Sequence, residues 1–123
     1  MDLATILLWV SALVFLGVGV QGLFMPRRIL EPLGGKLDTP SVANEVRANY
    51  GGMHTGLAVL MVVGALREPY RMSAVALMFT FTLGLCVGRA VSWVLDGRPN
   101  RYLRFFYGLE AAGAAAAGFV LFR

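Results

Sequence analysis

The chain is short of the residue types from which most active sites are built. Its 123 residues include one cysteine and one histidine, and only 15% are charged. The single cysteine, Cys86, cannot form a disulfide within the chain, and one histidine cannot supply paired His/Cys zinc ligands. The HExxH, GxSxG and P-loop motifs are also missing. We therefore predict no metal site, no cofactor and no catalytic residues, and an enzyme is not favoured; His54 with two acids leaves acid–base chemistry open.

Apolar residues take the place of the missing charge. They make up 58% of the chain, whereas an average soluble domain has about 45–50%. A soluble core in so short a chain could not enclose this much apolar surface. A membrane-spanning helix needs about 20 mostly apolar residues, and four stretches approach that length: residues 3–24, 49–66, 73–95 and 105–122. We therefore expect one domain, residues 1–123, folded as an all-α integral membrane four-helix bundle with the lipid bilayer as its solvent.

Basic residues are divided unevenly between the two predicted sides of the membrane. The first and third connections carry Arg27, Arg28, Lys36, Arg47, Arg98, Arg101 and Arg104. The opposite side carries Arg67, Arg71 and Arg123. Because Lys and Arg concentrate on the cytoplasmic side, we expect a multi-pass protein of a bacterial inner membrane with both termini in the periplasm. The net positive charge is then a matter of topology, and no nucleic-acid partner is expected.

The first connection is the only long one. Between Pro26 and Gly34, apolar residues are interleaved with charged ones, which predicts a short interfacial helix; an ordinary basic loop is the alternative. Further along, Ser41 is placed to cap a helix that leads into the second span.

Small residues recur within the predicted spans. Gly52 and Gly56 in the second span and Gly84 and Gly88 in the third each fit the GxxxG pattern, and Gly113 lies in an alanine-glycine run of the fourth. Small residues let helices approach closely in lipid, so we predict that these five glycines form helix-packing contacts.

A short sequence repeat links the two halves of the chain. Tyr50-Gly51-x4-Gly56 recurs as Tyr107-Gly108-x4-Gly113, each at the start of an even-numbered span. The repeat is consistent with two helical hairpins related by a pseudo-two-fold axis, and chance similarity is the alternative.

Two ionisable residues lie inside apolar stretches. Arg89 lies near the end of the third predicted span and Glu110 near the start of the fourth, so both fall at one depth below the cytoplasmic surface. Charge in hydrocarbon persists only when it is paired, hydrated or used. We predict that Arg89 pairs with Glu110 in a buried polar cluster; snorkelling of Arg89 to the surface is the alternative. The cluster is completed by Gln21, Tyr50, His54, Ser92 and Tyr107.

Within that cluster, His54, Tyr50 and Tyr107 are expected to add hydrogen bonds to the ion pair, and His54 as a packing side chain is the alternative. Three further residues are placed at the cytoplasmic rim: Glu45, Arg47 and Asp96. Asp96 and Gly97 are expected to end the third helix as a turn.

The chain resembles an uncharacterised family of small bacterial four-span membrane proteins, known as a domain of unknown function. The resemblance covers roughly Ala43 to the C-terminus. It is carried by Glu45-Val-Arg47-Ala-Asn-Tyr50-Gly51-Gly52, then Gly56, Gly88-Arg89, Ser92, Asp96-Gly97-x-Pro99 and Glu110. It implies a four-helix membrane domain and no established activity. Small multidrug transporters are similar in size, but they place their membrane carboxylate in the first span, whereas here it lies in the fourth.

Three functions are compatible with these patterns. The first is a non-enzymatic membrane protein whose Arg89/Glu110 pocket binds a small ligand or a lipid headgroup. The second is a structural subunit or assembly factor, with a membrane-protein partner or a second copy of the chain packed on its small-residue faces. The third is a small proton-coupled transporter that uses Glu110.

Overall fold

The structure, a computed structural model, describes all residues 1–123 and is entirely helical. Three helices, α1, α5 and α6, are long and apolar enough to cross a membrane. Segment η1 is a short 3-10 helix and η2 is a π-helix. In chain order the elements are α1 (Leu3–Phe24), α2 (Pro26–Leu30), η1 (Glu31–Leu33), α3 (Pro40–Val46), η2 (Arg47–Gly52), α4 (Met53–Leu66), α5 (Glu68–Asp96) and α6 (Arg101–Phe122).

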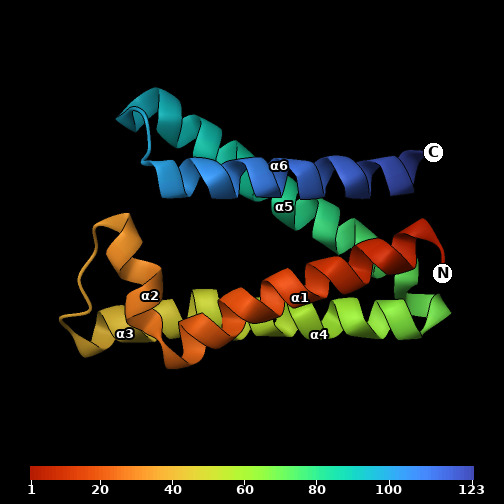
Figure 1. The fold of residues 1–123 in the computed structure, drawn as a ribbon, viewed down its shortest axis with the longest axis horizontal. Helices are drawn as coiled ribbons and strands as arrows, with labels where there is room; N and C mark the ends of the chain where they lie inside the picture. The colour runs from red at the N-terminus through yellow and green to blue at the C-terminus, as the bar shows by residue number, and fades with distance from the viewer.

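The helices are arranged as two pairs. Helix α1 lies along α4, and α5 lies along α6 (Figure 1). Both chain termini and the α4–α5 turn lie at one end of the molecule, which we call the terminal end. Segments α2 and α3 and the α5–α6 loop lie at the other end, which we call the basic end because most of the arginines are there. The α1/α4 and α5/α6 pairs cross near the terminal end and separate toward the basic end (Figure 1).

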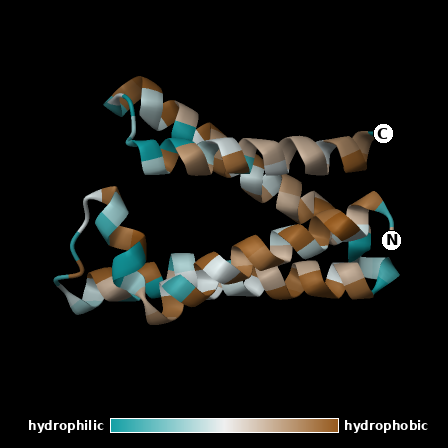
Figure 2. Cartoon of the chain, in the orientation of Figure 1, coloured by the Kyte–Doolittle hydropathy of each residue, from teal (hydrophilic) through white to brown (hydrophobic).

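Hydrophobic side chains hold the two pairs together near the terminal end. The core joins residues of α1, α4, α5 and α6, and its largest fully buried side chains are Leu8, Met61 and Val75. Figure 2 shows hydrophobic residues along the middle of the long helices and hydrophilic residues at the two ends. Because only the terminal end has a filled core, the pairs are free to diverge at the basic end.

The first helix begins at an acidic cap. The Asp2 carboxylate accepts a hydrogen bond from the backbone N–H of Thr5 at 2.8 Å. Hydrogen bonding from Thr5, by its side chain first and then by its backbone N–H, lowers the pKa of Asp2 below its ordinary value, because it favours the ionised carboxylate. The same carboxylate lies 3.5 Å from Arg71 at the start of α5, so the N-terminus is fastened to the second helix pair.

Two later helix boundaries test the sequence predictions. The prediction that Ser41 caps the helix after the long connection is wrong. The cap is Thr39, which accepts a hydrogen bond from Val42 N at 3.2 Å, and Pro40 follows at the first helical position. Proline suits that position because it has no N–H to leave unpaired. The predicted end of the third long helix is confirmed, since α5 ends at Asp96 and Gly97 has a φ of 97°.

The predicted glycine packing is wrong within this chain for four of the five glycines. Gly56, Gly84 and Gly88 have no neighbouring atom within 4 Å of an added Cβ, and Gly52 would meet only its own helix. Gly113 would make an ordinary contact with Met78. The GxxxG pattern gives the spacing of a helix face but not its direction, and these faces point away from the other helices.

Other glycines make the close contacts. A Cβ on Gly22 would lie 2.4 Å from the Gly51 nitrogen, and one on Gly19 would lie 2.4 Å from the Thr55 hydroxyl. Near the C-terminal end of α4, a Cβ on Gly64 would lie 2.5 Å from that of Ala74. Helix α1 therefore touches η2 backbone to backbone, which only glycine allows.

We predict that Gly22→Ala destabilises the fold by about 1–3 kcal/mol, because the new methyl group meets backbone that must move. The matched control is Gly17→Ala on the same helix, where an added Cβ meets nothing within 4 Å. The measurement is chemical unfolding in detergent micelles, followed by circular dichroism. Equal stability of the two variants would show that α1 and η2 are not in backbone contact.

Candidate functional site

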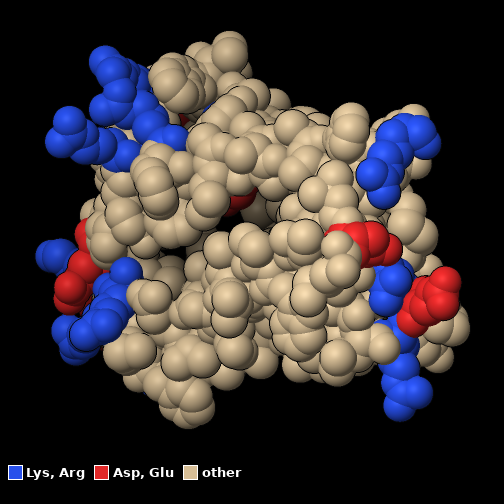
Figure 3. All heavy atoms as spheres, turned by 45° about the vertical axis from the view of Figure 1, so that its right-hand side comes forward, with Lys and Arg blue, Asp and Glu red and all other residues tan.

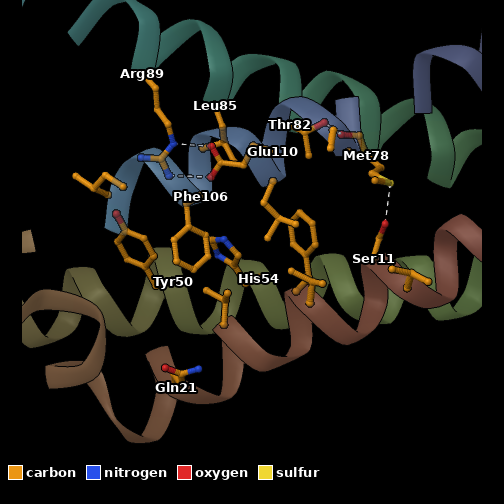
Figure 4. A pocket seen from close by; sticks show the side chains of 18 of the residues that line it. Ser11, Gln21, Tyr50, His54, Met78, Thr82, Leu85, Arg89, Phe106 and Glu110 are labelled. Atoms are coloured by element: carbon orange, nitrogen blue, oxygen red, sulfur yellow. Dashed lines mark hydrogen bonds and ion pairs between the residues drawn. The ribbon is translucent and has the colours of Figure 1, made fainter. Parts of the chain in front are cut away.

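A cavity of about 380 Å³ lies between the two helix pairs. It is bordered by α1, α4, α5 and α6, and also by α2, η1 and η2 at the basic end. Its lining is mostly apolar; the ionisable side chains lie toward the basic end, whereas Ser11 and Thr82 lie toward the terminal end (Figure 4). Cavities of about 300–1,000 Å³ with a few convergent polar groups are typical of small-molecule sites, which makes this cavity the candidate functional site.

Arg89 of α5 and Glu110 of α6 form a two-point ion pair in the cavity wall. Arg89 Nε donates to Glu110 Oε2 at 2.5 Å, and Nη2 donates to Oε1 at 2.8 Å. The planar guanidinium matches the carboxylate in this fork geometry, which a lysine cannot reproduce. The pair ties α5 to α6 at the level where the two helix pairs have separated (Figure 4).

The ion pair is not buried, contrary to the prediction of a buried polar pocket. The exposed fractions of the Arg89 and Glu110 side chains are 28% and 13%. The reason is that the helix pairs diverge here, so no third helix covers the ion pair. Arg89, Leu85 and Tyr50 also border a shallow groove between α5 and η2, beside Gly84 and Gly88.

Part of the Arg89 guanidinium has no partner within the protein. A guanidinium carries five N–H donors, and Glu110 accepts from two of them. The protein supplies no acceptor for the other three, so Arg89 can still donate hydrogen bonds to a bound group. Glu110 neutralises the charge of Arg89 but accepts from only two of the five N–H donors of the guanidinium.

Tyr50 and His54 face the ion pair from the opposite helix pair (Figure 4). His54 does not hydrogen-bond to the ion pair, contrary to expectation; its Nδ1 lies 2.9 Å from the carbonyl oxygen of Asn49. Because a carbonyl only accepts, Nδ1 carries the proton and the other ring nitrogen is left for a further interaction. The ring stacks on Phe15 and Tyr50, with centroids 5.5 Å and 5.8 Å away.

The π-helix η2 positions these two aromatic residues. Its wider turns place His54 against the carbonyl five residues earlier, at Asn49. Tyr50 makes no hydrogen bond to the ion pair, also contrary to expectation, and its phenol lines the cavity. π-turns inside helices occur frequently at functional sites.

Five of the seven predicted cluster residues line the cavity and two do not. Arg89, Glu110, His54, Tyr50 and Gln21 come together there. Ser92 and Tyr107, in contrast, lie outside the cavity. Ser92 donates to Asp96 at 2.8 Å, and the Tyr107 ring packs edge-on against Trp93. Each of these two residues shares a helix with a cavity residue but lies on a different face of that helix. Equal depth in the membrane therefore does not predict which residues line the cavity.

The three rim residues serve the helix ends at the basic end. Arg47 donates to the carbonyl oxygen of Leu23, which ends α1 without a helical partner. Glu45 accepts a hydrogen bond from Asn49 at 2.9 Å, and Asp96 accepts the one from Ser92. None of the three lines the cavity.

A roof over the polar end of the cavity was not predicted. Ile29 of α2 and Leu33 of η1 line this end, and Ile29 is buried. Asn100 fastens the roof to the other helix pair, because its amide donates to Pro32 O at 2.7 Å. Its carbonyl oxygen accepts from Leu103 N at 2.9 Å and caps α6. The sequence shows the capping residue before α6, but it cannot show the contact with Pro32.

Further lining residues were also missed. Phe106 precedes Glu110 by one helical turn and shares its face, a spacing that the sequence does show. Ser11 donates to the Met78 sulfur at 3.2 Å across the apolar end, and no pattern in the sequence indicates that contact.

We predict that the ion pair contributes a coupling energy of about 1–3 kcal/mol, as expected for a charge-assisted hydrogen bond. Arg89→Ala and Glu110→Ala should each destabilise the protein, and the double variant should lose less than the sum of the two. The measurement is a double-mutant cycle from unfolding in micelles, with Ser92→Ala as a control outside the cavity. Strict additivity would mean that the two side chains do not interact.

Comparison with known proteins identifies a family and no activity. The model of one family, a domain of unknown function (DUF4345), matches residues 3–121. No curated protein and no solved structure matches the chain. The resemblance to a family of unknown function is therefore confirmed, and it extends beyond Ala43 to almost the whole sequence. The chain belongs to the DUF4345 family.

Proposed function

We propose that the protein crosses the membrane four times, with the segment before α5 as the additional span. Helices α3, η2 and α4 follow one another without a break over residues 40–66. A continuous helix of this length, at about 1.5 Å per residue, exceeds the roughly 30 Å hydrocarbon core. The middle of this segment packs on α1 through Gly51, and α1 is itself a candidate span.

The charge distribution supports an orientation for these four spans. Blue and red residues gather at the ends of the molecule and leave an uncharged belt between them (Figure 3). The basic end carries most of the arginines, so it faces the cytoplasm and both termini face the periplasm. The pseudo-two-fold relation between the α1/α4 and α5/α6 pairs stays a prediction.

We predict that single cysteines will report this topology in a Cys86→Ser background. Glu68→Cys, in the α4–α5 turn, should react with a membrane-impermeant maleimide added to intact spheroplasts. Asp38→Cys and Arg98→Cys, at the basic end, should react only after permeabilisation. Labelling of Asp38→Cys and Glu68→Cys from the same side would mean that residues 40–66 do not cross the membrane.

For the biochemical role, we infer that the protein binds a single-chain amphiphile with an anionic headgroup and is not an enzyme. The observation that carries this proposal is the polarity of the cavity. Its lining is mostly apolar from Leu7 to Phe15 of α1, with Ser11 as the one polar side chain there, and the ion pair, His54 and Gln21 lie at the other end. A ligand that matches this lining has one long apolar part and one polar end.

Electrostatics favour a negative headgroup. Arg89 has three N–H donors that no protein group accepts, and the surrounding rim is basic. The lost hydration of an anion would be replaced by charge-assisted hydrogen bonds from Arg89, in surroundings where low dielectric strengthens them. Carboxylate and phosphate headgroups share this chemistry.

The size of the cavity favours one chain. A volume of about 380 Å³ is at the low end of the range for small-molecule sites. The lining follows α1 from Leu7 to Gln21, a path of about 20 Å at 1.5 Å per residue. A narrow site of this length fits a single extended hydrocarbon chain.

We predict that stearate binds to the protein in lipid nanodiscs, and that stearyl alcohol, with the same chain and no charge, binds at least about tenfold more weakly. Arg89→Gln combined with Glu110→Gln should remove this preference while keeping the site neutral. Gly113→Leu, which fills the cavity, should weaken both ligands. Affinities are measured by displacement of a fluorescent anthroyloxy-stearate.

Gly108→Leu is the matched control, because Gly108 is on the same helix, outside the cavity, with nothing within 4 Å of an added Cβ. Each variant is first checked by circular dichroism to be folded at the temperature of the binding measurement. If stearate does not displace the probe, or if Gly113→Leu binds it like Gly108→Leu, the proposed function is wrong.

A further inference from the structure

The cavity has a lateral opening between α1 and α6. Its exposed lining residues are all apolar there: Val10 and Val14 on the edge of α1, and Leu109, Ala112 and Ala116 on the edge of α6. Helices α1 and α6 approach each other at few points. Figure 3 shows a hollow in the uncharged face of the molecule, with an acidic side chain visible inside it. We call this opening the slot.

The slot opens toward the bilayer and not toward water. Its residues lie in the middle of α1 and α6, two candidate membrane spans, and within the uncharged belt. Four of them contribute only a methyl or a valine side chain, which leaves room for a hydrocarbon chain to pass. An opening bordered by apolar residues at this depth is in contact with lipid tails.

The polar end of the cavity, in contrast, is covered where α2 and η1 lie over it. Ile29 and Leu33 cover it, and the Asn100–Pro32 hydrogen bond of 2.7 Å fastens this roof to the start of α6. Tyr102 and Leu103 line the cavity beside this bond. Water-side entry would therefore require the roof to open, whereas entry through the slot requires no hydrogen bond to break.

From these contacts we propose that the amphiphile enters sideways from the bilayer through the slot between α1 and α6, headgroup toward the ion pair and chain along α1. The source is thus the cytoplasmic leaflet, whose anionic single-chain lipids have their headgroups near the level of the ion pair. This inference rests on the proposed function and adds the route and the source of the ligand.

The route is tested by the rates at which the ligand binds and leaves. Val14→Phe narrows the slot, and Leu13→Phe is its control, because Leu13 is exposed on the same helix but does not line the cavity. Asn100→Asp keeps the acceptor that caps α6 and removes the donor to Pro32, so it loosens the roof. Transfer of anthroyloxy-stearate from vesicles is followed by stopped-flow fluorescence.

With lateral entry, Val14→Phe slows association and dissociation together by about tenfold, the effect of a modestly higher barrier. A larger side chain that only weakened binding would speed dissociation, whereas a narrowed entrance slows both rates; Asn100→Asp leaves both rates unchanged. Faster exchange in Asn100→Asp, with normal rates in Val14→Phe, would place the entrance at the aqueous end and overturn the proposal. Normal rates in both variants would overturn it as well.

A second pair of variants and a binding control separate failure of the route from failure of the proposed function. If Val14→Phe also changes the Kd, Ala112→Phe narrows the slot from the α6 side, and Ala111→Phe, exposed and outside the cavity, is its control. If wild-type protein binds no stearate at all, the proposed function has failed. If only the proposed route is wrong, the wild-type protein still binds stearate, but the variants do not show the expected association and dissociation rates.

Discussion

The backbone contact between α1 and η2 determines where the cavity can form. Gly22 and Gly51 lie so close that no side chain fits between them, so these two helices leave no space of their own. Helices α1 and α4 therefore pack as one layer, and space can form only between this layer and helices α5 and α6. Their shared core lies near the terminal end, around Leu8 and Val75. Because helices that cross at one end must separate at the other, the space opens at the basic end.

The ion pair between Arg89 and Glu110 is a consequence of that separation. A charged side chain in a membrane helix is stabilised by a partner, by water or by a ligand. At the basic end the helix pairs are too far apart for full burial, so the ion pair stays partly exposed within the protein. Removal of either side chain leaves the other as an unneutralised charge, which is why the two act as a unit. The same exposure leaves donors of Arg89 free to act on another molecule.

The sequence predicts the long helices and the ion pair well, because both depend on position along the chain. Length and apolarity place α1 at residues 3–24, and depth along two helices brings Arg89 to Glu110. Direction around a helix axis is harder to predict. Gly84 and Gly88 have the spacing of a packing face, yet they point outward, and Ser92 shares a helix with Arg89 without sharing its surroundings. Gly22, which does make the close helix contact, has no distinctive sequence pattern around it.

Contacts between distant loops are outside the reach of local patterns, and the roof of the cavity depends on one. Asn100 is recognisable as a helix cap, since such a side chain before a helix accepts a backbone hydrogen bond. The other end of its amide reaches Pro32, 68 positions away. This one side chain therefore connects the start of α6 to the roof over the polar end of the cavity, while the apolar side stays open. A site that opens to the bilayer would select molecules already dissolved there, and the polar group on such a molecule would meet Arg89 in a low-dielectric setting, where a hydrogen bond to charge is strongest.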